Sequence, residues 1–157
     1  MPCPKCAVTP GYHSFISMGL LLRSSNSSTL FYTAPAKTAD FNEDGTKLAN
    51  IKIHVSEECR EPWIWVVDCG DMGLAHYTDF SFNWGLLGLL AADVMLQEIW
   101  IVRPNVWIRG VIAVLQTFSS APILGRIKYF DGSPLELDGL LSAEGMEASM
   151  RHWLISA

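Results

Sequence analysis

The sequence predicts an α/β protein built on a mixed, mostly parallel sheet flanked by helices. Residues 62–69, PWIWVVDC, and residues 98–102, EIWIV, are near-continuous apolar runs of β-forming residues, which is typical of strands buried on both faces. Residues 80–95, between these runs, have the pattern of a largely apolar helix. An order in which strands alternate with helices favours parallel pairing, because each return to the sheet then needs a crossover.

The N-terminal part begins with a short Cys/Pro-rich head, residues 1–13, which we separate from the domain at 14–157. Residues 14–22 and 29–33 are expected to be short strands, since the polar RSSNSS between them has the composition of a turn. Residues 46–59 carry apolar side chains at helical spacing, which predicts a helix with one buried stripe. The segment IKIHV inside this stretch also alternates as a strand would, but the helical spacing holds over the longer window.

The alternation continues beyond the second buried run. Pro104 closes the strand at 98–102, and residues 105–118 are predicted to form a helix. A possible short turn of helix at 121–126 leads to another short strand at 127–130. This part of the chain therefore supplies a further strand for the same sheet.

A capped helix is predicted after the last strand. In SPLE, Ser133 can cap the helix, Pro134 suits its first position, and Glu136 lies three residues after the cap. Gly145 is expected to end it. A last amphipathic segment follows, and we expect its apolar side to pack on the domain itself. That side is formed by Met146, Met150, Trp153 and Leu154.

The composition leans apolar and excludes some classes of function. Half of the 157 residues are apolar, six are Trp, and only 17% are charged, where about a quarter is usual. The net charge is −5 and no run of Lys or Arg occurs, so a nucleic-acid partner is not expected. The apolar stretches are interrupted by Asp93, Arg103 and Arg109, and they fall short of the roughly 18 residues of a spanning helix. With no leader pattern and four Cys, we expect a cytoplasmic protein.

The predicted helix at 105–118 has almost no polar face. Its polar residues are Asn105, Arg109, Gln116 and Thr117, and the other residues are nearly all apolar. A half-buried surface helix normally shows a wider polar face. The helix could be wrapped completely by its own domain, it could pack its second face on a partner, or it could line a pocket on one side and meet a membrane on the other.

Three blocks of the chain follow a family pattern. PWIWVVDCGDMGLAHYTD combines a strand ending in Asp with a Gly-containing turn, LQEIWIVRPNVWIRGVIAVLQTF combines a strand, a Pro-rich bend and an apolar helix, and SAPILGRIKYFDGSPLELDGLL combines a short strand with a capped helix. Together they resemble the CRAL-TRIO lipid-binding domain, a family that includes phosphatidylinositol-transfer proteins and the lipid-binding module of neurofibromin. The piece TLFYTAPAKTADFNEDGTKLANIKIHV looks like the start of the family's divergent branch, so the resemblance spans about residues 29–145.

The resemblance implies a lipid pocket between sheet and helices. It also implies that the helix at 105–118 acts as a movable gate, which is apolar on its lipid side and touches a membrane when open. The expected lipid-binding residues are Trp100, Val102, Trp107, Val111, Leu115, Phe118 and Ile127. Arginine suits a phosphate headgroup, and the headgroup candidates are Arg103, Arg109 and Arg126. Surface placement at element ends is the plainer interpretation of Arg103 and Arg109.

The chain departs from the phosphatidylinositol-binding members of that family. Val94 is closest to the position where they carry a glutamate, and Ile123 stands for a threonine. Arg126 keeps the positive charge that follows three residues later. Recognition of an inositol headgroup is therefore not expected. The helical lobe that precedes the domain in many members does not appear here, which favours a binding or scaffold role over lipid transfer by this domain alone.

Carboxylates follow the first buried strand. Asp68, Asp71 and His76 lie where α/β sheets gather ligand sites, so they could form an acid/base site. The favoured interpretation is that Asp68 anchors the turn that contains Gly70 and Gly73, by accepting hydrogen bonds from backbone N–H groups. None of the sequence motifs GxGxxG, GxSxG, HExxH or the P-loop occurs, and we expect no enzymatic activity.

The head contains a pair of cysteines with the spacing of zinc ligands. Cys3 and Cys6 form a CxxC motif, and His13 could be a third ligand, but no second CxxC follows. Cys59 and Cys69 are distant in the sequence. A redox pair would need a neighbouring helix N-terminus, which the following AVTPGY does not predict. We therefore expect neither a bound metal nor another cofactor.

The function predicted from the sequence is non-catalytic binding of a lipid or another hydrophobic ligand under the helix at 105–118. Transient contact with a membrane would accompany it. The alternative is a module of the same fold without a pocket, in which the apolar helix binds a partner protein or a second copy of the chain.

Overall fold

The protein is an α/β domain with one mixed sheet. The computed structural model describes residues 3–38 and 47–157, so the expected start of a helix at Thr46 lies outside the described residues. Within them, five strands pair in the order β1-β2-β3-β4-β5, antiparallel between β1 and β2 and parallel elsewhere. The strands are β1 (Ile16–Leu22), β2 (Ser27–Thr33), β3 (Trp63–Asp68), β4 (Leu96–Val102) and β5 (Ile127–Phe130). The predicted class, a mostly parallel mixed sheet flanked by helices, is confirmed.

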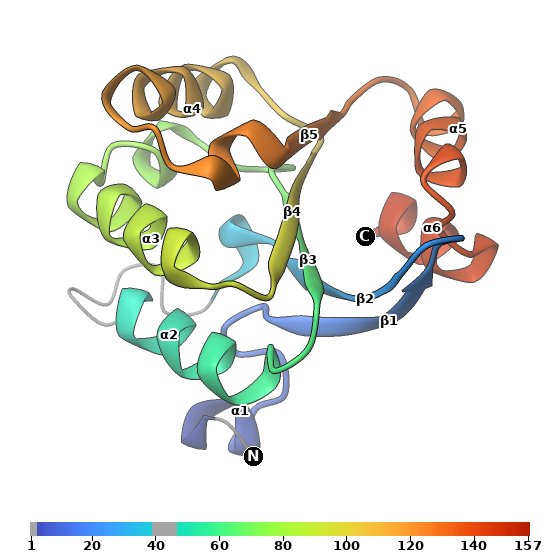
Figure 1. Cartoon of the computed structure of the whole chain (residues 1–157), viewed down its shortest axis with the longest axis horizontal. Helices are drawn as coiled ribbons and strands as arrows, with labels where there is room; N and C mark the ends of the chain where they lie inside the picture. The colour runs from blue at the N-terminus through green and yellow to red at the C-terminus, as the bar shows by residue number, and fades with distance from the viewer. Residues whose placement is uncertain (1–2, 39–46) are drawn as a thin grey trace.

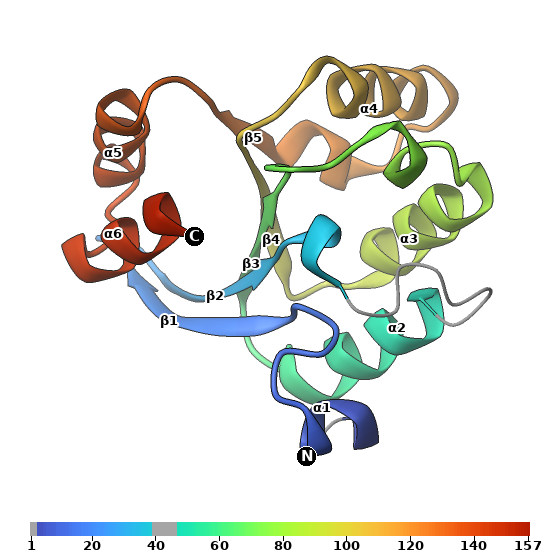
Figure 2. The same ribbon diagram turned by 180° about the vertical axis from the view of Figure 1, so that it is seen from behind.

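Helices cover both faces of this sheet (Figure 1). One face carries α2 (Lys47–Glu58), α3 (Phe80–Ala92) and α4 (Val106–Phe118), which connect the parallel strands. The other face carries α5 (Pro134–Ala143) and α6 (Ala148–Ser156), and Figure 2 shows the same division from behind. From β2 to β5 each step moves to the adjacent strand in one direction. Crossovers of a single handedness then place α2, α3 and α4 on one face, which leaves the other face to the C-terminal helices.

The central strands are buried on both sides because their side chains alternate between the two faces. In β3, Trp63 and Trp65 pack toward α2, α3 and α4, whereas Ile64 and Val66 pack toward α5 and α6. Trp63, Ile64 and Val66 have no exposed surface. This double burial explains why the segment is apolar at nearly every position rather than at alternate ones.

Several helix starts follow from local sequence. Ser133 caps α5 and forms a capping box with Glu136, as the sequence predicts. Asn105 caps α4, because its Oδ1 accepts hydrogen bonds from the backbone N–H groups of Trp107 and Ile108 at 3.1 Å each. The possible helical turn before β5 is present as the short 3₁₀ helix η3 (Pro122–Arg126).

Two local expectations are wrong. The sequence predicts no helix beside Cys3 and Cys6, but α1 (Pro4–Val8) begins directly after Cys3, and Pro4 suits its first position. The helix predicted at 80–95 ends at Ala92, because the Asp93 side chain accepts a hydrogen bond from Met95 N and turns the chain into β4.

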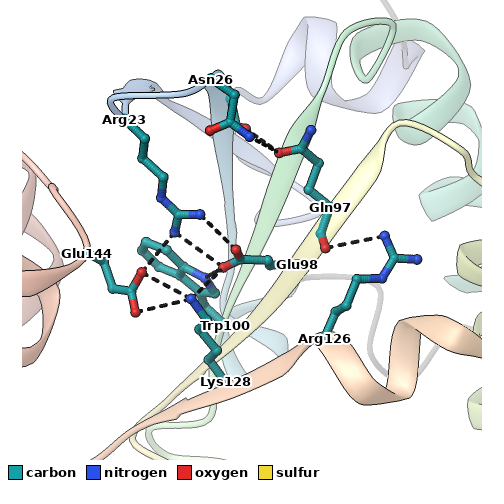
Figure 3. Close-up of polar contacts among 9 residues, drawn as sticks. Arg23, Asn26, Gln97, Glu98, Trp100, Arg126, Lys128 and Glu144 are labelled. Carbon is teal, nitrogen blue, oxygen red and sulfur yellow. Dashed lines mark hydrogen bonds and ion pairs between the residues drawn. The ribbon is translucent and has the colours of Figure 1, made fainter.

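Glu98 is the centre of a polar network between the sheet and α5 (Figure 3). Its carboxylate accepts hydrogen bonds from Arg23 Nη1 at 2.7 Å and from Trp100 Nε1 at 2.6 Å, and Lys128 Nζ lies 3.3 Å away. Arg23 and Lys128 also contact Glu144, which follows α5. Burial alone would raise the pKa of Glu98, but the bonds from Arg23 and Trp100 and the Lys128 charge lower it to about 2.

We expect Glu98→Gln to change the acid sensitivity of the fold. The pKa of Glu98 is lower in the folded state than in the unfolded state. Its contribution to stability is therefore complete above about pH 4.5 and is lost as the pH falls toward about 2. The variant should lose about 1.5–3 kcal/mol of unfolding free energy at pH 7, and this deficit should shrink over that range. Urea unfolding from pH 7 to pH 2 measures it, with exposed Glu61→Gln as the control. A deficit that does not depend on pH would contradict the assignment.

Candidate functional site

A cavity of about 190 Å³ lies between the sheet and the three helices α2, α3 and α4. The sheet forms its floor through Trp65 and Val67 of β3 and Ile99 and Ile101 of β4, together with Ile127 of β5. These residues share one face because side chains two apart in a strand point the same way. The floor is therefore apolar across three adjacent strands.

The helices supply an equally apolar cover. From α3, Leu87 and Leu90 reach the cavity, and both are nearly buried. The side chains of α4 that line it are spaced three and four apart, so that they form one stripe along the helix. They are Ile108, Val111, Ile112 and Leu115. A pocket that is apolar on both the sheet and the helix side suits a hydrophobic ligand.

The opposite side of α4 is apolar as well, and it is exposed. Val106 and Phe118 are each 73% exposed, Trp107 is 49% exposed, and Val114 is 44% exposed. We call these four residues the outer face of α4. The inner stripe lines the cavity, whereas the outer face meets solvent without the polar side chains that a surface helix normally has there. Neither side of α4 is packed entirely within the domain.

Polar side chains form part of the cavity lining. They come from the end of β2, from the segment that follows it, from the start of α2, from the segment before α3 and from α3 itself. They are Thr33, Thr38, Lys47, Asn50, His76 and Asn83. We call these six residues the polar rim. Lys47 Nζ lies 3.6 Å from Asp79, so a cation of the rim already has a carboxylate near it.

Tyr77 also lines the cavity, and its hydroxyl oxygen is buried. Burial and the neighbouring Cys69 thiol raise the pKa of Tyr77 to about 12, although Asn105 acts in the opposite direction. Burial likewise raises the pKa of Cys69 to about 12. Both groups are therefore uncharged at neutral pH.

The expected lipid-binding residues divide into three groups. Val111, Leu115 and Ile127 line the cavity. Trp100 and Val102 do not, because they point to the other face of the sheet and pack with Phe130 beneath α5 and α6. The remaining two residues belong to the outer face of α4 and are exposed to solvent. They are Trp107 and Phe118.

The three expected headgroup arginines lie away from the cavity lining. The Arg103 guanidinium binds Asp68 and donates to the carbonyls of Leu154 and Ile155 in α6. Arg109 lies over the Tyr129 ring, 4.4 Å from its centroid. Arg126 donates hydrogen bonds to the backbone carbonyls at the start of β4. Each arginine thus contacts groups of the domain itself.

The turn after β3 is organised by Asp68. Its Oδ1 accepts a hydrogen bond from Gly70 N at 2.9 Å, and its Oδ2 accepts one from the Tyr32 hydroxyl at 2.7 Å. Burial alone would raise the pKa of Asp68, but the bonds from Arg103, Tyr32 and Gly70 lower it below its ordinary value. Asp68 is thus a buried carboxylate whose oxygens are occupied by donors of the domain.

The remaining residues of this turn do not join Asp68 in one site. Gly73 precedes the short 3₁₀ helix η2 (Leu74–His76), and its N–H donates to His76 Nδ1 at 3.0 Å. His76 lines the cavity, whereas Asp68 bonds toward α6 on the other face, and Asp71 is exposed. The three side chains considered for acid/base chemistry are therefore distributed over different surroundings.

A cluster of possible metal ligands lies beside the cavity. Cys3, Cys6 and His13 come together with His54 of α2, and one ligand atom from each lies within 4.8 Å of the others. The sequence predicts no metal here, because no second CxxC follows the first. His54 is the residue that sequence reasoning missed. It is 41 positions beyond His13, and the helical spacing of 46–59 gives no sign that it faces the head.

No family model and no curated protein matches this chain. In the described ranges, 3–38 and 47–157, every helix is too short or too polar to cross a membrane. The described residues thus form an α/β domain with an apolar pocket between its sheet and its crossover helices.

Proposed function

We propose that this domain binds a lipid or another hydrophobic small molecule in the cavity beneath α4 and performs no catalysis. The observation that carries the proposal is a cavity of about 190 Å³ whose floor and cover are both apolar. A single water needs only about 10–15 Å³, so this space is suited to a larger guest. The proposal also follows from the resemblance of the sequence to the CRAL-TRIO domain.

The proposed ligand places its apolar part between Ile101 and the inner stripe of α4. Each buried CH₂ group contributes about 0.8 kcal/mol. A dozen carbons therefore contribute several kcal/mol after the cost of ordering the chain. The polar end of the ligand would lie at the polar rim, which includes Lys47, Asn50 and His76. This position differs from that of the arginines that the sequence suggests.

Helix α4 is proposed to act as the gate. It follows the bend at Pro104 and ends before a non-helical segment that includes Ser119, so its two ends offer places for a hinge. Opening would expose the inner stripe, and the outer face of α4 would then rest on the bilayer. Exposed aromatic and aliphatic side chains such as Trp107 and Phe118 suit the membrane interface. Peripheral membrane contact is thus part of the same proposal.

Native mass spectrometry of the protein purified from cells without detergent tests the proposal, followed by solvent extraction and lipid identification. We expect one lipid-sized molecule per chain, which is released on denaturation. A ligand-free monomer that also fails to take up lipid from phospholipid vesicles would contradict it.

The variant Val111→Asp should abolish ligand retention. Val111 lines the cavity, and a carboxylate there would have to be desolvated against an acyl chain. We expect the retained lipid to fall by at least about tenfold, which corresponds to a penalty of about 1.4 kcal/mol.

Val114→Asp is the matched control, because Val114 lies on the same helix but on its outer face. It should keep the lipid in solution and weaken binding to vesicles. Circular dichroism establishes that both variants fold. If Val111→Asp is folded and retains lipid as the wild type does, α4 is not the cover of a lipid site.

The alternative function is a protein-interaction module, and one observation favours it. The outer face of α4 is apolar and exposed, and such a surface suits a protein partner as well as a membrane. Light scattering during size-exclusion chromatography measures the molar mass and so distinguishes a self-associated protein from a monomer. If the protein carries no bound lipid and forms dimers, and if Phe118→Asp converts these dimers to monomers, the interaction module would be supported.

A further inference from the structure

Four side chains from three separate segments converge at the edge of the domain where α1 lies against α2 (Figure 1). Cys3 and Cys6 come from the start of α1, His13 from the turn before β1, and His54 from α2. Cys3, His13 and His54 are between 2% and 4% exposed. Buried groups of this kind need partners, since each can donate or accept a hydrogen bond or bind a metal.

Four of the six distances among the ligand atoms are close to the edges of a tetrahedron around one ion, and all six are within 4.8 Å. Bonds of about 2.3 Å to sulfur and about 2.0–2.1 Å to nitrogen hold neighbouring sulfur and nitrogen atoms about 3.5 Å apart and two nitrogens about 3.3 Å apart. Here Cys3 Sγ and Cys6 Sγ lie 3.5 and 3.4 Å from His13 Nδ1. His54 Nε2 lies 3.5 Å from Cys6 Sγ and 3.0 Å from His13 Nδ1.

Hydrogen bonds within the cluster do not account for this arrangement. An imidazole nitrogen has one proton or one in-plane lone pair, so it forms one good hydrogen bond. His13 Nδ1 nevertheless lies within 3.5 Å of three ligand atoms, those of Cys3, Cys6 and His54. Three neighbours around one such nitrogen are what a shared central cation produces.

We propose that Cys3, Cys6, His13 and His54 form a closed tetrahedral zinc site that fastens α1 to α2. Two thiolates and two neutral imidazoles suit Zn²⁺ in charge as well as in softness, because the buried complex is then neutral. Four protein ligands leave no open position, which makes the site structural rather than catalytic. The proposal is independent of the proposed lipid function, although His13 also lines the cavity, so the ion would hold part of its wall.

The surroundings of His54 orient its ring for this task. Its other nitrogen, Nδ1, lies 3.5 Å from Glu58 Oε2, one helical turn further along α2. Phe15 stacks on the imidazole with ring centroids 5.2 Å apart and an angle of 27° between the planes. A carboxylate on the far side of a ligating histidine fixes the tautomer that presents Nε2 to the metal. Glu58 is therefore a positioning residue of the site.

A dithiol redox pair is the competing explanation for a CxxC motif. Such a pair involves Cys3 and Cys6 alone, and it gives no reason for His13 and His54 to direct ring nitrogens at the same point. In the reduced chain the four cysteines are free thiols, so both states are open to experiment.

The test is the metal content of the full-length protein, purified under reducing conditions without a metal-affinity step and measured by elemental mass spectrometry. We expect one zinc ion per chain. Replacement with Co²⁺ should give the visible absorption of a tetrahedral ion with thiolate charge transfer. X-ray absorption should find two sulfur and two nitrogen neighbours at about 2.3 and 2.0–2.1 Å.

Ligand variants decide whether the ion sits at this cluster. Cys6→Ser and His54→Asn should each lose the stoichiometric zinc, whereas His152→Asn, at an exposed histidine of α6, should keep it. Reduced wild-type protein that takes up neither Zn²⁺ nor Co²⁺ overturns the proposal, and so does zinc that persists in both ligand variants. The measurements on the wild type stand even if a ligand variant fails to fold.

Glu58→Gln tests the orientation of His54 separately. We expect zinc affinity, measured by competition with a chromophoric chelator, to fall about 10–100-fold while the stoichiometry is kept. Glu57→Gln is the matched control, since Glu57 is the preceding residue of α2 and is exposed beside Arg60. Equal affinity in both variants would exclude the carboxylate from the site.

Discussion

Replacing Asp68 with asparagine should lower the free energy of unfolding by about 3 kcal/mol. The carboxylate is 2% exposed and accepts hydrogen bonds from Arg103, Tyr32 and Gly70 N. An amide keeps one oxygen but places an NH₂ group against one of these donors, and it leaves the Arg103 charge without its partner. Breaking a fully buried pair costs about 3–5 kcal/mol, and the lower end applies because Arg103 retains contact with water.

Urea unfolding at several pH values checks this prediction, with Asp71→Asn as the control. Asp71 lies in the same turn, is exposed and has a φ of 62°, a conformation that asparagine tolerates, so the control should change stability by less than about 0.5 kcal/mol. The pKa of Asp68 is lowered in the folded state, so its contribution to stability is present above pH 3.8, the ordinary pKa, and is lost on further acidification. The deficit of Asp68→Asn should therefore be largest at neutral pH. A neutral-pH deficit below about 1 kcal/mol would contradict the anchoring role.

Replacing Leu141 with alanine should lower the free energy of unfolding by about 3–5 kcal/mol. Leu141 has no exposed surface and packs, with Val66 and Trp100, in the core that α5 forms with the sheet. Removal of its side chain leaves a cavity beneath the sheet, and burial of this degree puts the loss toward the upper part of the range for such changes.

Leu140→Ala is the matched control, since Leu140 is the preceding residue of α5 and is 45% exposed. It should cost less than about 1 kcal/mol. Thermal or urea unfolding measures both variants. The proposed ligand cavity beneath α4 lies on the other face of the sheet. Folded Leu141→Ala should therefore retain ligand as the wild type does. Equal destabilisation by the two changes would mean that α5 does not cover the sheet as described.

The secondary structure could be predicted from the sequence to a large extent. The run at 62–69 is apolar at successive positions because β3 is buried on both faces, and the capping box of α5 is a purely local arrangement. The predicted secondary structure is wrong where only a few residues determine a helix or its end. The helix α1 has five residues, and the end of α3 depends on one hydrogen bond at Asp93.

The lining of the cavity could be predicted only in part. Alternation divides β4 into two sets of side chains. The sequence pattern favours Trp100 as a pocket residue, but Ile99 and Ile101 line the cavity instead. The sequence does not state which set faces which helices. That choice follows from the handedness of the crossovers, which places α2, α3 and α4 together on one face.

By itself, the sequence determined the α/β class, the alternating strands and helices, and the two apolar sides of the helix at 105–118, because periodicity and capping act over a few residues. The tertiary structure alone decided which apolar residues enclose the cavity. It also decided that Arg103 binds Asp68 and that His54 meets Cys3 and Cys6. These contacts join positions far apart in the chain. They depend on the packing of whole helices and strands, which the local sequence pattern does not encode.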